Sequence, residues 1–159
     1  MKTLLACTIN AEAHTVLVDV RDTLLDLVRE RIGLTGSKEG CGNGNCGTCT
    51  VLLDGAAVNA CLVLALEVAG REVVTIEGVA RVGELHPIQS ALVESGGTQC
   101  GFCTPGIVLA AKALLDTNAD PSEQDIRQAI AGNLCRCTGY GKIVDAIATA
   151  AARLRETET

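Results

Sequence analysis

The stretch C-G-N-G-N-C-G-T-C, residues 41–49, decides how the first half of this chain folds. Its cysteines, Cys41, Cys46 and Cys49, stand in a C-x4-C-x2-C order with glycines between them. Glycine accepts backbone conformations with positive φ, so a loop rich in it can wrap closely around an object and turn its N–H groups inward. The stretch therefore predicts a loop that closes around something that thiolates bind.

A fourth cysteine, Cys61, follows eleven residues after Cys49 and completes a quartet. Four thiolates suit two irons bridged by two sulfides, and they also suit a structural zinc ion. The order C-x4-C-x2-C…C is typical of plant-type [2Fe–2S] ferredoxins, whereas a zinc knuckle usually presents paired C-x-x-C hairpins. The spacing favours a [2Fe–2S] cluster on Cys41, Cys46, Cys49 and Cys61, with zinc as the alternative.

A second quartet lies in the other half of the chain, in a C-x2-C-x31-C-x-C order: Cys100, Cys103, Cys135 and Cys137. A disulfide between Cys135 and Cys137 is disfavoured, because in an extended stretch their Cα atoms would lie roughly 6.6 Å apart, near the upper limit for that bond. Each cysteine pair stands just before the beginning of an expected helix, whose positive end favours an anionic cluster. Spacing alone leaves a [2Fe–2S] cluster and zinc both open for this quartet.

The composition excludes several classes of function. A net charge of −6 over 159 residues argues against nucleic acid as a partner, because phosphate binding needs a basic face. The longest apolar stretch is G-I-V-L-A-A-K-A-L-L, which contains Lys112. With about ten residues, this stretch is too short to span a bilayer. The N-terminal M-K-T-L-L-A-C-T-I imitates a signal peptide, but its short, threonine-interrupted apolar run favours a strand. We therefore expect a cytoplasmic chain, whose clustered cysteines are metal ligands rather than disulfides.

Hydrophobic patterns divide the chain into a strand-rich half and a helical half. The first half has a predicted helix capped by Asp22 or Thr23 and ended by Gly33, and a hairpin turn at Asp54-Gly55. The predicted strands are 4–9, 15–20, 50–53, 56–61 and 72–76, and the predicted helices are 24–32, 87–95, 104–116, 121–131 and 140–154. Thr104 and Ser122 are expected N-caps.

This order predicts an α+β protein with two domains. The first is an N-terminal β-grasp, plant-type ferredoxin-like [2Fe–2S] domain at residues 1–77. A linker follows at residues 78–85, and a C-terminal four-helix domain, which carries the second cysteine quartet, occupies residues 86–159.

Four stretches together carry a resemblance to a known family: G-C-G-N-G-N-C-G-T-C-T-V, N-A-C, T-Q-C-G-F-C-T-P-G and A-G-N-L-C-R-C-T-G-Y. In this order the chain resembles the small iron–sulfur subunit of the molybdenum hydroxylases, the xanthine dehydrogenase and carbon monoxide dehydrogenase family. The likeness covers nearly the whole chain. It implies two [2Fe–2S] clusters, one held by each quartet.

The resemblance also implies a role and partners. Electrons from substrate hydroxylation would run from molybdopterin through the helical-domain cluster and then the ferredoxin-like cluster to FAD or another acceptor. Gln99 would hydrogen-bond the pterin, and Cys137 would be the ligand closest to it. A large partner subunit would hold most of the molybdopterin and a medium subunit the FAD, in a heterotrimer or a dimer of heterotrimers. Without the resemblance, Gln99 would be interpreted as a solvent-facing amide before a ligand.

No substrate chemistry is expected in the chain itself, because it has no credible acid–base pair, nucleophile–base pair or nucleotide-binding glycine motif. The alternatives are a free-standing two-cluster ferredoxin and a zinc-stapled interaction module. Cys7 is expected in the core, and His14 and His86 on the surface. The sequence leaves the roles of three residues open: Asn43, Asn45 and Tyr140.

Overall fold

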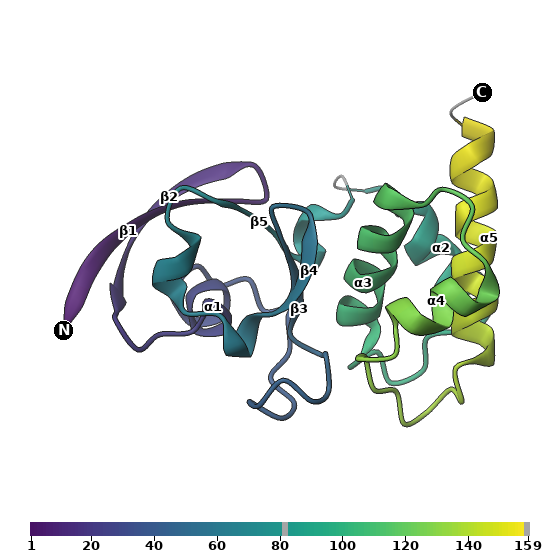
Figure 1. Ribbon diagram of the computed structural model, residues 1–159, viewed down its shortest axis with the longest axis horizontal. Coiled ribbons are helices and arrows are strands. Elements are labelled where there is room, and N and C mark those ends of the chain that lie inside the picture. The colour runs from purple at the N-terminus through teal and green to yellow at the C-terminus, as the bar shows by residue number, and fades with distance from the viewer. Residues whose placement is uncertain (81–82, 158–159) are drawn as a thin grey trace.

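The computed structural model describes residues 1–80 and 83–157; Arg81 and Val82 of the predicted linker and the last two residues of the chain, 158–159, lie outside the described part. The first half forms a five-stranded mixed sheet in the order β2-β1-β5-β3-β4 (Figure 1). Its strands are β1 Lys2–Ile9, β2 Glu12–Asp19, β3 Thr50–Leu53, β4 Ala56–Asn59 and β5 Glu72–Val74. The N-terminal stretch is therefore a strand, as predicted.

Two tight turns connect the antiparallel strand pairs. The predicted hairpin between β3 and β4 turns at Asp54 and Gly55, whose φ values are +48° and +83°. Asn10 and Ala11 turn between β1 and β2 with φ values of +52° and +65°. Positive φ at both central residues matches the right-handed twist of the strands that the turn joins. β5 then pairs parallel to β1 and antiparallel to β3, which brings the two hairpins into one sheet.

The helix in this half packs its leucines against the sheet. Thr23 is the N-cap, and its hydroxyl oxygen accepts a hydrogen bond from the Asp26 N–H in a reciprocal capping box. The helix begins as α1, Leu24–Asp26, and continues as a π-helical turn, Leu27–Arg31. The predicted helix is thus confirmed, but only its first turn is α-helical. Short 3-10 turns follow the strands at Ala60–Leu62, Ala65–Val68 and Ile76–Gly78.

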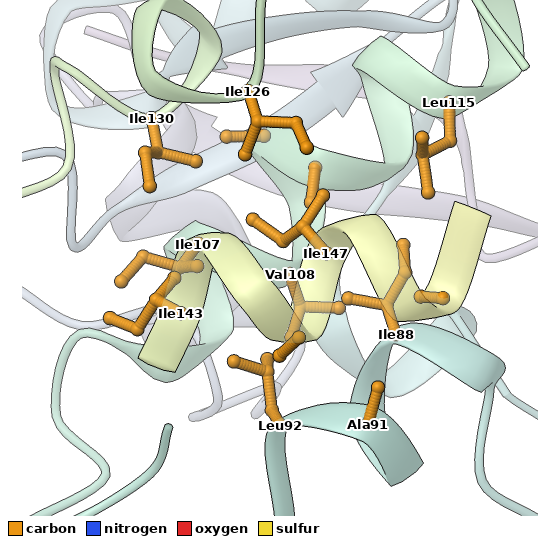
Figure 2. Close-up of a cluster of buried hydrophobic side chains, with 14 of the residues drawn as sticks. Ile88, Ala91, Leu92, Ile107, Val108, Leu115, Ile126, Ile130, Ile143 and Ile147 are labelled. Carbon is orange, nitrogen blue, oxygen red and sulfur yellow. The ribbon is translucent and has the colours of Figure 1, made fainter. Parts of the chain in front are cut away.

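Four helices form the second half: α2 Pro87–Glu94, α3 Thr104–Thr117, α4 Glu123–Ala129 and α5 Gly141–Thr157. Their inward side chains pack around α5, with Ile143 and Ile147 fully buried (Figure 2). The other labelled members of this core come from α2, α3 and the α4 region: Ile88, Ala91, Leu92, Ile107, Val108, Leu115, Ile126 and Ile130. Aliphatic residues make up most of this core, which explains how a chain with so few aromatic residues builds it.

Two predictions about helix ends need correction. Thr104 is not the N-cap of α3: it is the first helical residue, and Cys103 occupies the cap position without a side-chain cap hydrogen bond. His86 is not a bland surface residue. It is half-buried and caps α2, since its Nδ1 accepts a hydrogen bond from the Ile88 N–H at 3.2 Å. Ser122 caps α4 as predicted, in a capping box with Asp125.

The two halves pack directly against each other. Helix α3 lies against β3, and Leu52 of β3 belongs to the same buried cluster as the helical core. Figure 1 shows the sheet with α1 on one side and α2–α5 on the other, with α3 next to β3 and β4. Among the described residues, no helix is both long and apolar enough to cross a bilayer.

Candidate metal centres

The first quartet comes together in two pairs. The Cys46 thiol is close enough to Cys41 to lower its pKa, and Cys61 is close enough to Cys49 to affect its pKa. Cys46 is also close enough to act electrostatically on Cys49. The sheet half thus brings together all four predicted ligands. Within residues 1–80 and 83–157, no three His, Cys, Asp or Glu side chains are grouped as ligands of a single ion.

Backbone N–H groups of the glycine-rich loop surround the Cys41 sulfur. The N–H of Asn43 and then the Cys46 thiol lower the pKa of Cys41 to about 7, and the N–H groups of Cys46 and Asn45 add to this effect. Gly42 and Gly44 make this possible, because both have positive φ. Asn43 and Asn45 therefore act here through their backbone, which settles one question that the sequence left open.

The opposite side of the quartet is buried. Cys49 is in the core of the sheet half, and burial raises its pKa to about 11, with Cys61 and Cys46 as further influences. One edge of this site is thus open and rich in N–H donors, and the other edge is enclosed. Hydrogen-bond donors of this kind stabilise the negative charge on the sulfur ligands of a cluster.

The second quartet also comes together in two pairs. The sulfurs of Cys100 and Cys137 lie 3.6 Å apart, and Cys135 is close enough to Cys103 to raise its pKa. Cys100 and Cys137 are exposed, whereas Cys103 is buried at the beginning of α3. Burial, followed by the neighbouring Cys135, raises the pKa of Cys103 to about 12. The segment before α3 and the segment before α5 thus meet at this site.

Side chains, more than glycines, shape the loop between α4 and α5. The Tyr140 hydroxyl accepts a hydrogen bond from the Cys135 N–H at 2.7 Å and lies 3.1 Å from the Asn133 carbonyl oxygen, to which it donates. The Thr138 hydroxyl lies 3.1 Å from the Cys135 sulfur. Burial opposes ionisation of Cys135, but Thr138 and the backbone N–H groups of Cys137 and Thr138 outweigh it, so its pKa is lowered. Tyr140 therefore anchors the ligand loop.

Two exposed residues flank the outer edge of the second site. Gln99 precedes Cys100 and is exposed, and Phe102 is 46% exposed between Cys100 and Cys103. Gln99 is thus exposed to solvent at this edge, and its role toward a pterin stays a prediction. Of the other residues singled out in the sequence, Cys7 is buried in β1 and His14 is half-buried on β2.

The two ligand loops touch each other. The Leu134 N–H donates a hydrogen bond to the carbonyl oxygen of Cys46, with 2.9 Å between N and O. The neighbouring Asn133 is buried and donates to the carbonyl oxygen of Gly47. Neither residue was predicted from the sequence. The only signal was their place immediately before Cys135, which does not reveal a contact with a loop more than 80 residues away.

The residues present fit two [2Fe–2S] clusters. Each quartet offers two pairs of thiolates, which is what two irons bridged by two sulfides require. The first loop is shaped to lie close to such a group: a Cβ added at Gly40 would be 2.9 Å from the Cys46 sulfur, and one at Gly44 would be 2.4 Å from Leu62 Cδ1. Glycine at both positions keeps the loop next to its own ligands.

Comparisons with known proteins agree with this fit. A family model described as "2Fe-2S iron-sulfur cluster binding domain" matches residues 7–73, and one described as "[2Fe-2S] binding domain" matches residues 75–148. The chain is thus a protein with two [2Fe–2S]-binding regions, one for each cysteine quartet.

Individual relatives define the family more closely. The nicotinate dehydrogenase small FeS subunit of Eubacterium barkeri is 48% identical over 145 residues, which are 91% of this chain and 92% of that subunit. The aldehyde oxidoreductase of Megalodesulfovibrio gigas is 50% identical over 148 residues, 91% of this chain but 16% of that protein. A crystal structure of quinoline 2-oxidoreductase from Pseudomonas putida 86 matches with a TM-score of 0.94 and 40% identity over 99% of both chains. The chain belongs to the family of small iron–sulfur subunits of the molybdenum hydroxylases.

Proposed function

We propose that this chain is the electron-transfer subunit of a heteromeric molybdenum hydroxylase. Cys41, Cys46, Cys49 and Cys61 would hold one [2Fe–2S] cluster, and Cys100, Cys103, Cys135 and Cys137 the other. When bound, these clusters supply one-electron transfer between a molybdopterin centre and FAD or another acceptor. The finer division of the chain belongs to the same proposal: a β-grasp ferredoxin-like domain at residues 1–77, a linker at 78–85 and a four-helix domain at 86–159.

One observation carries the proposal: the second site has one edge open to solvent and the other joined to the first site. Cys100 and Cys137 form the exposed edge. Behind them, Cys135 follows directly after Leu134, whose N–H is hydrogen-bonded to the Cys46 carbonyl. A relay between a docked donor and a second centre needs this arrangement, with access on one side and contact on the other.

In this proposal, the exposed edge of the second site faces the partner subunit. Gln99 would donate to or accept from the pterin, and Cys137 would be the ligand nearest to it. A large subunit would hold most of the molybdopterin, and a medium subunit would hold FAD, in a heterotrimer or a dimer of heterotrimers. The reduced thiols that such sites need suit the cytoplasm.

Substrate choice lies outside this chain in the proposal. The relatives carry names that refer to nicotinate, an aldehyde and quinoline, yet the portions that match this chain are 40–50% identical to it. The chain's own task is to hold the two clusters, set their environment and keep them in contact.

Purification of the tagged chain from its native host tests the proposal. We expect a stable complex containing a larger subunit with molybdenum, together with iron and acid-labile sulfide. In that complex, Cys49→Ala should leave the second site reducible by the partner and block electron flow to the acceptor. A chain that purifies alone with both clusters intact would instead be a free-standing ferredoxin. A colourless chain with zinc would be an interaction module.

A further inference from the structure

Asn133 lies at the seam between the two ligand loops. The residue is 4% exposed, and its Nδ2 donates hydrogen bonds to the Gly47 carbonyl oxygen at 2.9 Å and to Thr50 Oγ1 at 3.1 Å. The Thr50 hydroxyl donates in turn to the same Gly47 carbonyl at 2.7 Å. One buried amide from the helical half thus binds two acceptors of the sheet half.

These acceptors belong to the first ligand loop itself. Gly47 lies directly after Cys46, and Thr50 lies directly after Cys49. On the other side, Asn133 is two residues before Cys135, and the intervening Leu134 donates its N–H to the Cys46 carbonyl. The side chain of Asn133 and the backbone of Leu134 therefore connect ligand-bearing segments of both sites.

The backbones at this seam are in direct contact. A Cβ added at Gly47 would be 2.4 Å from the Gly132 carbonyl oxygen, and one added at Gly106 in α3 would be 2.3 Å from the Gly47 carbonyl oxygen. Gly106 is three residues after Cys103, a ligand of the second site. Figure 1 shows the loop after α1 and the loop between α4 and α5 at the same edge of the molecule, near the beginning of α3. At Gly47 and Gly106, therefore, no residue larger than glycine fits without moving the neighbouring backbone.

We propose that Asn133 is a positioning residue that clamps the two ligand loops together and fixes the separation of the two clusters. An amide suits this place, because both of its Nδ2 hydrogens face oxygen acceptors. A carboxylate has no hydrogen to donate and would face the Gly47 carbonyl with like charge, although its shape is the same. The inference rests on the proposed two-cluster relay, whose rate depends on that separation.

The test uses the full chain carrying its iron, with the Asn133→Asp variant. Dithionite reduces the clusters, and electron paramagnetic resonance measures the dipolar coupling between them, which falls steeply with their separation. We expect the variant to show a smaller splitting, or lines broadened by a range of cluster separations. Hydrogen exchange at the Leu134 amide should be at least about tenfold faster, since tenfold corresponds to about 1.4 kcal/mol of lost opening free energy.

Gln128→Glu is the matched control. It makes the same amide-to-acid change on an exposed side chain of α4, and we expect the wild-type splitting and exchange rate. If Asn133→Asp lowers the iron content, the Thr50→Val variant takes its place in the same two measurements. It keeps the hydrogen bond from Asn133 to Gly47 and removes the second acceptor, so the same changes should appear in weaker form.

Wild-type splitting and wild-type Leu134 exchange in an iron-replete Asn133→Asp variant would overturn the proposal. So would an unchanged Thr50→Val variant if Asn133→Asp does not load iron. Neither readout needs a partner subunit. Failure of the clamp is therefore distinguishable from failure of the proposed function, which would show as the absence of a complex.

Discussion

The sheet half and the helical half hold similar sulfur quartets by different means. In the sheet half, one short segment carries three cysteines, and its glycines turn backbone N–H groups toward Cys41. In the helical half, two segments far apart in the sequence meet at the beginning of α3, and hydroxyl groups of Thr138 and Tyr140 hold the loop in place. The first site depends on local backbone conformation, and the second on tertiary structure. The two sites should therefore fail differently.

The largest expected effect concerns the glycines of the first loop. Gly42 and Gly47 have nearly the same φ, +66° and +68°, but a Cβ at Gly42 meets only Glu39 Oε1 at 3.5 Å, whereas one at Gly47 meets the Gly132 carbonyl oxygen at 2.4 Å. Gly42→Ala should lower the free energy of unfolding by about 1–2 kcal/mol, the cost of the left-handed backbone. Gly47→Ala should cost about 4 kcal/mol or more, because it also forces the halves apart. Equal losses in urea unfolding would contradict the close contact of the halves.

Tyr140→Phe breaks the tertiary support of the second site. The variant keeps the ring and the positive φ of the position but leaves the Cys135 N–H and the Asn133 carbonyl without the hydroxyl partner. We expect the free energy of unfolding of the helical half to fall by about 1–3 kcal/mol, with no change in the sheet half. In a urea titration of the reduced protein, the second-site paramagnetic signal should disappear at lower urea than in the wild type. The first-site signal in the same sample is the control, and a parallel loss of both signals would contradict this account.

Lowering the pH should destabilise the helical half before the sheet half. Burial lowers the pKa of His86, Lys112 adds to this effect and Asp116 opposes it. A base with a lowered pKa binds protons less readily in the folded than in the unfolded state. Its contribution is therefore complete above the ordinary histidine pKa of about 6.5 and is lost as the pH falls below it.

At low pH the protonated His86 no longer caps α2, which lowers the stability of the helix by about 1 kcal/mol. This change should be measurable as faster hydrogen exchange of the Ile88 amide. His86→Asn keeps a capping acceptor and should remove this pH dependence. His14→Asn, on β2, should leave it in place. The interpretation of His86 as a cap is wrong if both variants respond to acid as the wild type does.

The smallest expected effect compares two threonines. Thr138 Oγ1 accepts the Tyr140 N–H, so its proton can be donated to the Cys135 sulfur. Thr48 Oγ1 lies 3.3 Å from the Cys46 sulfur but donates to the Lys38 carbonyl oxygen. Thr138→Val should lower the potential of the second site by about 40 mV, equivalent to one hydrogen bond of about 1 kcal/mol. Thr48→Val should shift the first site less, and equal shifts in a redox titration would contradict this assignment of the protons.

The contrast between the two sites also explains what the sequence could predict. The glycine-rich loop, both quartets, the hairpin at Asp54-Gly55 and the helices follow from local patterns and spacing, and the structure contains them. The N-cap of α3 was wrong because the chain places the ligand Cys103, rather than Thr104, at the helix boundary. The cap formed by His86 and the contact of Asn133 with Gly47 depend on tertiary packing. Neither has a signature at the level of residue spacing.

Iron and sulfide content, measured with the paramagnetic spectrum of the reduced chain, tests the central claim most directly. The wild type should contain about four irons and four sulfides and give two distinct signals. Cys49→Ala and Cys103→Ala should each retain about two irons and only the signal of the other site. A wild-type chain with about two zinc ions and no colour, or single variants that lose both signals together, would contradict two separate clusters held by the two quartets.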